Sequence, residues 1–210
     1  MDLNKMSIAD IVDAANRGEL TTDGYKDIIC KDGTVLRLAV LGTHHDVMED
    51  GNTATVTFGI RDCLPGIEKC MNDSWTNEGE SQLERWLNEE WVNNLPDELL
   101  SRIVPVKKKT AHSGLDSTID ERLCRAFLPS EIEVFGKNYY SSAGEGRQYD
   151  HFKDWHNRVK SVYGESGDWW SLRSPDSGNT ANFCIVSNSG SYSNYYANNY
   201  YGVSPCFAIN

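Results

Sequence analysis

Hydrophobic residues recur at helical spacing close to the amino terminus. Residues 8–17 place their isoleucine, valine and alanine side chains on one face, Ser7 begins a capping box before them, and Gly18 provides a stop. β-Branched and apolar residues dominate residues 34–41 and 53–58. The pattern predicts a short helix followed by two core strands, the first of which is entered from a tight turn.

Helical spacing returns in the middle of the chain. Ser81 and Glu84 form a second capping box, and apolar residues follow at helical intervals as far as Trp91, which predicts an amphipathic helix. Pro96 is expected to open one or two further helical turns. From Asp150 a helix of about ten residues is expected, because large apolar residues follow at intervals of three and four.

Two segments between these elements are predicted to be loops. Residues 107–109 are three lysines, which in an acidic chain indicate a solvated loop. Residues 136–150 are rich in glycine, serine and tyrosine without periodicity, which indicates a loop partly fixed by its aromatic residues. Helices in the first two thirds and short strands at both ends favour an α+β fold over a regular alternation of strands and helices.

The charge of the chain limits its partners. Thirty-one acidic and twenty basic residues among 210 give a formal net charge of -11. Such a chain repels phosphate backbones and anionic membranes, so nucleic-acid binding is not expected. Neither a membrane span nor a secretory signal is visible, so we expect folding in the cytoplasm and no membrane insertion.

The cysteines are spread along the chain with at least seven positions from one to the next. This spacing does not suit a zinc site or a redox pair, and a reduced compartment favours thiols. We predict small buried side chains at Cys30, Cys63, Cys70, Cys124, Cys184 and Cys206.

The histidines do not form a recognisable metal site. His44 and His45 are adjacent, so on a strand they would point to opposite faces, and with Asp46 they are expected to lie in a polar loop. His151 and His156 are five positions apart, which fits one helix face poorly. No nucleophile elbow, phosphate loop or dinucleotide fingerprint occurs. We therefore predict no metal, no cofactor and no enzymatic activity.

The composition changes after Arg173. The rest of the chain contains no Lys, Arg or Glu and one acid, Asp176. In residues 187–201, thirteen of fifteen residues are Asn, Ser or Tyr, and five of these are tyrosines. Disordered tracts are poor in aromatic residues, whereas tyrosine set among Ser, Gly and Asn is typical of an antibody paratope. Apolar strand-like runs bracket this segment, so we predict a presented loop with both ends fixed.

Three blocks carry a resemblance to a known group of proteins. WWSLRSP at 169–175, FCIVSNSG at 183–190 and GVSPCFAI at 202–209 resemble the C-terminal half of C-type-lectin-like variable proteins of diversity-generating retroelements. They also resemble related bacterial and phage domains of unknown function that end in a Gly-Val-Arg/Ala-Pro motif, although Ser204 stands at the third position here. The resemblance covers residues 25–210 and implies a C-type-lectin-like fold with helices and small twisted antiparallel sheets.

The resemblance also implies a source for the unusual composition. In such systems an error-prone reverse transcriptase changes positions templated by adenine, and AAC or AAT codons then become Tyr, Ser, Asp, His, Thr, Gly and other codons but never Lys, Glu or stop codons. By analogy, the variable, ligand-facing positions are Ser187, Asn188, Ser189, Ser191, Tyr192, Ser193, Asn194, Tyr195, Tyr196, Asn198, Asn199, Tyr200 and Tyr201. Further candidates are Ser171, Asn179 and Asn182.

The resemblance to C-type-lectin-like proteins raises two other activities that this fold can carry. Formylglycine-generating enzymes use two late cysteines, but Cys184 and Cys206 lie inside apolar runs, which suits burial better than reactivity. Calcium-dependent sugar binding needs clustered acids, which the C-terminal third lacks. Sugars can still stack on tyrosine and tryptophan without a metal.

The expected function is therefore binding. The resemblance implies a hypervariable receptor-binding protein of a phage tail that recognises a bacterial surface protein or glycan, with residues 171–204 as the variable region. Residues 1–24, which include the first helix, are expected to dock it to the virion, which is assembled in the host cytoplasm. Trimers are usual for such proteins. The alternatives are a bacterial protein in the cytoplasm or at the cell surface and, from another class, an enzyme of formylglycine-generating type.

Overall fold

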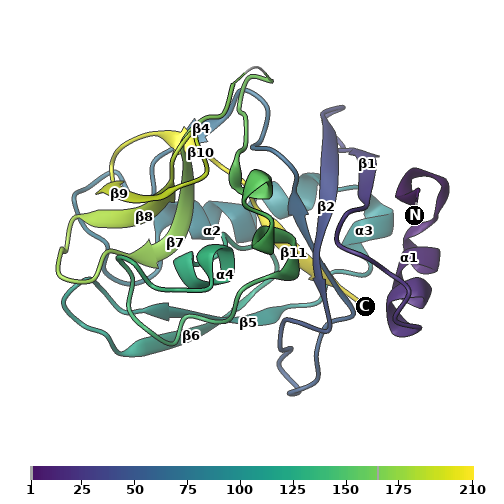
Figure 1. Ribbon diagram of the computed structural model, residues 1–210, viewed down its shortest axis with the longest axis horizontal. Coiled ribbons are helices and arrows are strands. Elements are labelled where there is room, and N and C mark those ends of the chain that lie inside the picture. The colour runs from purple at the N-terminus through teal and green to yellow at the C-terminus, as the bar shows by residue number, and fades with distance from the viewer. Residues whose placement is uncertain (1, 165) are drawn as a thin grey trace.

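The computed structural model describes residues 2–164 and 166–210, which form a mixed α+β fold (Figure 1). The α+β prediction is confirmed. The described residues contain two larger sheets and a separate hairpin, with short helices packed around them. The helices are α1 (Ile8–Asn16), α2 (Gln82–Glu89), α3 (Asp97–Leu100) and α4 (Glu131–Phe135), with 3-10 turns η1 (Leu3–Lys5), η2 (Trp91–Asn94), η3 (Asp150–Lys153) and η4 (Trp155–Arg158).

The first sheet joins the beginning of the chain to its end. Its strands follow the order β1-β2-β3-β11, and every neighbouring pair is antiparallel. They are β1 (Tyr25–Ile29), β2 (Val35–Thr43), β3 (Val56–Ile60) and β11 (Cys206–Ile209). Both core strands expected near the amino terminus are present, with β3 starting later than expected, and the left-handed Gly33 (φ 88°) forms the turn into β2.

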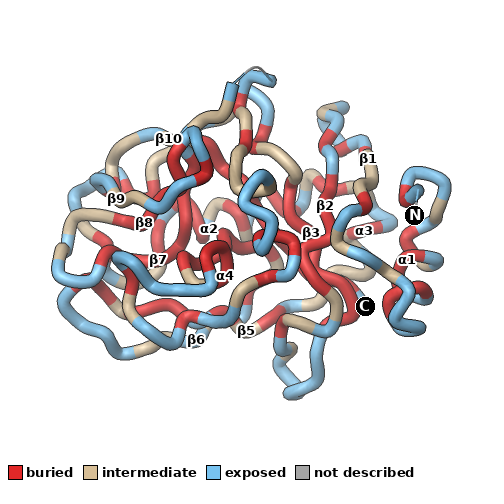
Figure 2. The backbone as a smooth tube through the Cα atoms, in the orientation of Figure 1, coloured by how far each residue is buried: buried red, intermediate tan, exposed pale blue. Residues whose placement is uncertain are grey.

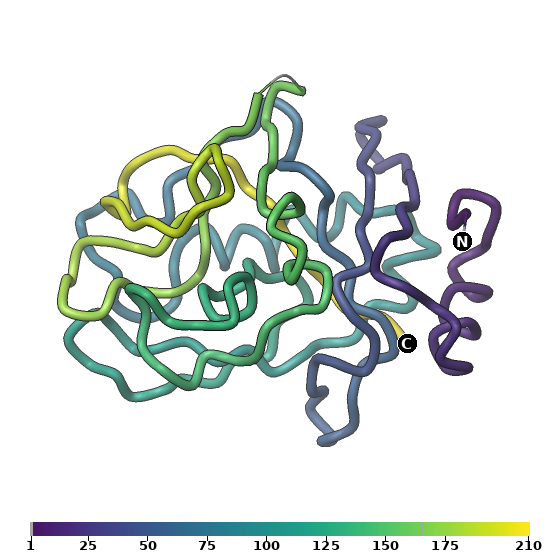
Figure 3. The backbone as a smooth tube through the Cα atoms, viewed as in Figure 1, coloured from purple at the N-terminus to yellow at the C-terminus, as the bar shows by residue number. Residues whose placement is uncertain are grey.

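The second sheet lies at the other end of the long axis (Figure 1) and has the order β4-β10-β7-β8-β9. Its neighbouring strands are antiparallel except for the parallel pair of β10 and β7. They are β4 (Glu68–Lys69), β10 (Tyr201–Gly202), β7 (Trp170–Pro175), β8 (Asn182–Val186) and β9 (Tyr192–Tyr196). The carboxyl-terminal trace in Figure 3 runs from this sheet through the middle of the molecule into the first sheet, so one short segment links the two.

Three helices begin with a complete capping box. Ser7 and Ser81 begin α1 and α2 as predicted, and in each case the side chain accepts a hydrogen bond from the third residue of the helix. Ser130 and Glu133 form a third box at α4, a signal that the sequence contains and that we did not use. Trp91 lies beyond α2, in η2.

The prediction of a helix of about ten residues from Asp150 is wrong. The chain forms two 3-10 turns, η3 and η4, because Asp154 adopts an extended conformation (φ -78°, ψ 115°) between them. The Asp154 carboxylate accepts a hydrogen bond from the backbone N–H of His156 (3.0 Å). Asp154 therefore caps a new turn instead of continuing the first one.

The prediction of a solvated loop at the three lysines is also wrong. Residues 107–109 lie in β5 (Val106–Ala111), which pairs antiparallel with β6 (Ile119–Cys124). Alternation along the strand directs Lys108 inward, where its side chain is 3% exposed, whereas Lys109 is exposed. Residues 136–150, the other predicted loop, contain no helix or strand before η3 begins at Asp150.

The interior consists of two apolar clusters, and Figure 2 shows that β7, β8 and β11 are almost continuously buried. The first cluster includes Ile8, Ile11 and Val12 from α1, together with residues of β2 and β3. The inner face of α1 is therefore packed into the core. A docking role for residues 1–24 stays a prediction, and only the exposed face of α1 is available for it. Met1 lies outside the described residues. The second cluster lies beneath the second sheet and includes Trp170 and Cys184.

Candidate functional site

Residues 187–201, which we call the display segment, follow β8 at the edge of the second sheet. They form a tight turn, then β9, then a second turn that leads into β10. The prediction of a loop without regular structure is wrong over β9, which pairs with β8 along five residues. The prediction that both ends are fixed is confirmed, because β8 and β11 are buried strands on either side.

Strand alternation divides the side chains of β9 between two faces. Tyr192, Asn194 and Tyr196 point to one face, and Ser193 and Tyr195 point to the other. The three tyrosines are exposed by between 42% and 46%, although the strand itself is hydrogen-bonded into a sheet. The strand thus presents large side chains from a fixed backbone.

Aromatic residues from another part of the chain meet the first tyrosine of β9. The ring of Tyr139 stacks on that of Tyr192 with centroids 3.6 Å apart and an interplanar angle of 5°. Tyr140 lies tilted against Tyr192 at 6.0 Å, and Phe135 contacts the edges of the pair from below. The end of β9 near Tyr192 is therefore part of a small aromatic group.

A second aromatic group surrounds the other end of β9. Trp75 stacks on Tyr196 with centroids 5.0 Å apart and an interplanar angle of 14°. Tyr195 contacts Tyr196 and Tyr201 edge to face. The aromatic surface, as we name the solvent-facing members of both groups with the neighbouring Tyr200, consists of Trp75, Tyr139, Tyr140, Trp169, Tyr192, Tyr195, Tyr196, Tyr200 and Tyr201.

The remaining polar candidates of the display segment are mostly accessible. The structure leaves wholly or partly exposed Asn188, Ser189, Ser191, Ser193, Asn194, Asn198 and Asn199. Ser187 is the exception, because it is buried and its hydroxyl accepts a hydrogen bond from the backbone N–H of Ser191 (3.1 Å). Ser187 therefore shapes the turn before β9 rather than facing a ligand.

Of the three candidates outside the display segment, Ser171 is fully buried in β7, where it pairs with Ile185 of β8. Because Ser171 is buried, the prediction that it faces a ligand is wrong. Among the described residues, its hydroxyl has no hydrogen-bond partner. Asn182 is partly buried and donates a hydrogen bond to the side chain of Asn194 (2.8 Å), which orients that amide on β9.

Asn179 lies in the turn between β7 and β8. Its side-chain oxygen accepts a hydrogen bond from the backbone N–H of Ala181, and its carbonyl oxygen accepts one from Asn77 (2.6 Å). At the other end of the variable region Ser204 is buried, and its hydroxyl donates to the carbonyl oxygen of Ile60 (3.1 Å). Both residues hold the backbone in place.

Sequence reasoning missed the aromatic residues from elsewhere in the chain that lie against β9 and β10. Trp75, Tyr139, Tyr140 and Trp169 are all exposed aromatic side chains. Trp75 lies in a polar stretch without periodicity, and the adjacent pair Tyr139 and Tyr140 lies in the loop that we described only as partly fixed. A bulky aromatic residue in a polar loop was the available signal.

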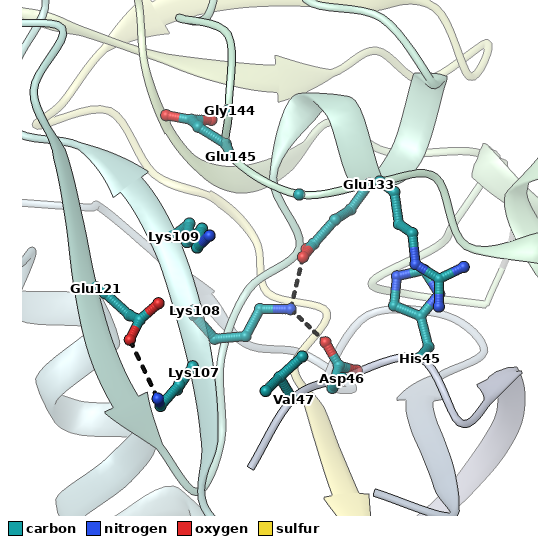
Figure 4. A pocket seen from close by; sticks show the side chains of 12 residues that line it. His45, Asp46, Val47, Lys107, Lys108, Lys109, Glu121, Glu133, Gly144 and Glu145 are labelled. Atoms are coloured by element: carbon teal, nitrogen blue, oxygen red, sulfur yellow. Dashed lines mark hydrogen bonds and ion pairs between the residues drawn. The ribbon is translucent and has the colours of Figure 1, made fainter. Parts of the chain in front are cut away.

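Behind the second sheet lies a buried ion network that the sequence analysis did not anticipate (Figure 4). The ammonium of Lys108 donates to carboxylate oxygens of Asp46 (2.7 Å) and Glu133 (2.5 Å). The guanidinium of Arg173 on β7 donates to both oxygens of Glu133 (2.6 and 3.0 Å). The hydroxyl of Tyr149 donates to Asp46 (2.8 Å). The network ties β5, α4 and β7 to the loop after β2.

The charges within this network shift the pKa values of its carboxyl groups. Burial alone would raise the pKa of Asp46, but the neighbouring Lys108 charge and its hydrogen bond outweigh burial and lower that pKa to about 2. Burial also opposes ionisation of Glu133, and the charges of Arg173 and Lys108 lower its pKa nonetheless. Both carboxylates are therefore charged at neutral pH.

A cleft of about 430 Å³ opens over this network, and Lys109, Glu121 and Arg147 are among its lining residues (Figure 4). Burial raises the pKa of Glu145 at its edge to about 7, although this carboxylate accepts a hydrogen bond from the N–H of Ala111. The charges at the bottom of the cleft neutralise one another, because Lys108 and Arg173 pair with Asp46 and Glu133. The network therefore supports β7 from behind.

The residues of the predicted polar loop after β2 lie next to this network. The backbone from His44 to Asp46 is irregular, as expected, and the ring of His45 stacks on that of Tyr149 at 4.1 Å. Burial lowers the pKa of His45. Nowhere in residues 2–164 and 166–210 do three or more His, Cys, Asp or Glu side chains converge in a way that would hold a metal ion.

The cysteines are free thiols, and five of the six are buried as predicted. Cys70 is the exception, since it is partly exposed beside Asp73. Burial raises the pKa of Cys206 to about 12 and that of Cys184 well above its usual value. Every helix in the described part of the chain is too short or too polar to cross a membrane.

The fold and the site together define a class: a mixed α+β protein that exposes aromatic and amide side chains at the edge of a small sheet. The chain belongs to the family of the domain of unknown function DUF6273, which matches residues 66–210. The match contains the whole second sheet and leaves α1 and β1 to β3 outside. No curated protein and no solved structure matches the chain.

Proposed function

We propose that this protein is a recognition protein that binds a bacterial surface structure through the aromatic surface. The observation that carries the proposal is the exposure of Tyr192, Tyr195 and Tyr196 on a strand that is itself hydrogen-bonded into a packed sheet. Rigid tyrosines supply contact area with little loss of side-chain entropy, which is the physical basis of paratope composition. Exposed aromatic patches of this kind mark interaction sites.

A C-type-lectin-like architecture and diversification by a retroelement are part of the same proposal. The mixed antiparallel sheets and the return of β11 into the first sheet agree with that architecture. The accessible positions of the display segment are Asn, Ser and Tyr, the residues that altered asparagine codons yield, while the buried strands on both sides are apolar. We propose a virion protein of a phage tail, with a bacterial cell protein as the alternative.

Binding is tested with fluorescently labelled protein on a panel of intact bacterial cells of both envelope types, measured by flow cytometry. Replacing Tyr192, Tyr195, Tyr196 and Tyr200 together by serine is expected to abolish binding, because each tyrosine that seats in a partner contributes about 1 to 2 kcal/mol. The melting temperature is expected to fall only modestly, because the stacks of Tyr192 and Tyr196 are lost while the pairing of β9 with β8 and the buried core stay intact.

The matched control replaces Ile29 and Val35 by serine. These side chains are exposed apolar partners across the hairpin of β1 and β2, at the far end of the molecule (Figure 1). The control is expected to bind like the wild type. The proposed function is wrong if the wild type binds no cell of the panel, or if the tyrosine variant binds as well as the control.

Diversification is tested by sequencing the gene in sibling isolates. Differences are expected at the exposed positions of the display segment and not at Ser171, Ser187 or Ser204, which are buried. An identical display segment in all isolates, or differences spread evenly over the gene, would contradict this part of the proposal.

A further inference from the structure

Trp75 is held in place by a buried amide. Its ring is 64% exposed and stacks on Tyr196. Two residues further along, the fully buried Asn77 donates hydrogen bonds to the carbonyl oxygens of Asn179 (2.6 Å) and Asn182 (2.7 Å). The loop of Trp75 is thereby fastened to the strands that carry the display segment, and its ring is a fixed part of the surface.

Tyr139 is held by a buried carboxylate. Oε2 of Glu131, which is fully buried, accepts hydrogen bonds from the backbone N–H groups of Tyr139 (2.8 Å), Tyr140 (3.0 Å) and Ser141 (2.8 Å), and Oε1 accepts a second one from Tyr140 (3.2 Å). The hydroxyl of Ser141 donates to the same carboxylate (2.8 Å). Charge-assisted hydrogen bonds of this kind fix the loop, so the stack of Tyr139 on Tyr192 is preformed.

The two stacks lie at opposite ends of β9 and are joined by an amide. Tyr192 and Tyr196 are four residues apart on the same face of the strand, a separation of about 13 Å. Asn194 lies between them on that face, with its oxygen bound to the amide of Asn182. On this face of β9 the aromatic surface is thus a row of two flat aromatic platforms with a hydrogen-bonding group between them.

This row lacks charges of its own. From residue 174 to the end of the chain the one charged side chain is Asp176, which is 8% exposed. Asp73 and Glu78 flank Trp75 in its loop, whereas at the other end the exposed Lys137 is two residues from Tyr139 and the guanidinium of Arg158 lies 4.9 Å from the ring of Phe135. Neither an acidic nor a basic polymer would therefore meet an opposite charge along the whole row.

We propose that the aromatic surface binds an uncharged polysaccharide of the bacterial envelope, with Trp75 and Tyr139 as fixed stacking platforms. The inference rests on the proposed function and specifies its ligand. Sugar rings present C–H faces to flat aromatic rings and hydroxyl groups to amides, and such stacking needs no opposite charge. Trp75 and Tyr139 lie outside residues 187–201, so both platforms keep their own identity when the display segment varies.

The experiment compares binding of the labelled protein with intact cells after two treatments. Periodate cleaves the vicinal diols of sugars, and protease digestion removes surface proteins. We expect periodate treatment to abolish binding and protease digestion to leave it unchanged. On untreated cells, Trp75→Ala and Tyr139→Ala are each expected to lower affinity at least tenfold, whereas Trp75→Phe and Tyr139→Phe keep a flat ring and retain most of it.

Trp155→Ala is the matched control, because Trp155 is 53% exposed and its ring lies tilted against that of His156 rather than on the aromatic surface. It is expected to bind like the wild type. Binding that survives periodate treatment but not protease digestion would show that the ligand is not a polysaccharide, and the proposed function would still hold. Periodate-sensitive binding that Trp75→Ala and Tyr139→Ala both retain would show that these two residues are not the stacking platforms. A wild type that binds no cells would overturn both proposals.

Discussion

Replacing Lys108 by methionine is expected to destabilise the protein strongly. Methionine preserves the length of the side chain but leaves Asp46 without its cationic partner. It also removes one of the two cations that contact Glu133. All four side chains of this network are at most 4% exposed, so water cannot replace the lost ammonium.

The expected loss follows from the geometry of the network. Removing one partner from a buried ion pair costs about 3 to 5 kcal/mol. Because Arg173 still neutralises Glu133 through two hydrogen bonds, we expect the lower end of this range, about 3 kcal/mol. For a chain of this size that corresponds to a decrease in melting temperature of about 6 to 12 °C.

Urea unfolding followed by circular dichroism measures the loss of free energy. Lys109→Met is the control, because the exposed neighbour on the same strand should change stability by less than about 0.5 kcal/mol. Adding Asp46→Asn to Lys108→Met removes the orphaned charge and should recover part of the loss. The reasoning is refuted if the free energy of unfolding of Lys108→Met at pH 7 lies within about 0.5 kcal/mol of the wild-type value, the range of an ordinary surface substitution.

Three further outcomes are expected. In the native protein a thiol reagent should label Cys70 rapidly and leave Cys184 and Cys206 unmodified until unfolding, which mass spectrometry detects; rapid labelling of either buried thiol would favour the enzyme alternative. Because burial raises the pKa of Glu145 to about 7 from 4.5, its contribution to stability is full below pH 4.5 and is lost as the pH rises to 7, so Glu145→Gln should flatten the pH dependence of unfolding in this window. Gly114→Ala should lower stability by about 1 to 3 kcal/mol in urea unfolding, since a methyl group there would lie 2.0 Å from a backbone carbonyl oxygen; an unchanged midpoint would contradict the tight packing of this turn.

Acid stability provides a separate check of the ion network. The pKa of Asp46 is lowered to about 2 in the folded protein, so its contribution is complete above the ordinary value of 3.8 and disappears as the pH falls toward 2. Asp46→Asn is therefore expected to lose stability mainly at neutral pH and to approach the wild type near pH 2. An equal difference at both pH values would show that Asp46 is not ionised in the native state.

Elements with local signals could be predicted from the sequence. Ser7 and Ser81 cap helices through contacts within four residues, so their patterns are complete in a short window. The polar composition after Arg173 marked the display segment correctly as accessible, with the buried Ser187 as an exception. Such features depend on near neighbours along the chain.

Features that depend on distant partners could not be predicted in the same way. Lys108 is separated from Asp46 by 62 positions and from Glu133 by 25, so nothing near it in sequence indicates burial. β9 has too few apolar residues to show an alternating pattern, and its strand conformation comes from pairing with β8. Trp75 joins the site through a stack across more than half of the chain.

The position of the display segment just before β10 and β11 limits how the gene can change. A lost or gained nucleotide within that tract would replace every residue that follows it, including the whole of β11, which pairs with β3 over four residues. Such alleles would encode proteins without the strand that closes their first sheet. If the proposed function holds, new binding specificities arise here by exchange of single bases, and the mechanism that changes this tract has to leave the reading frame of the final codons intact.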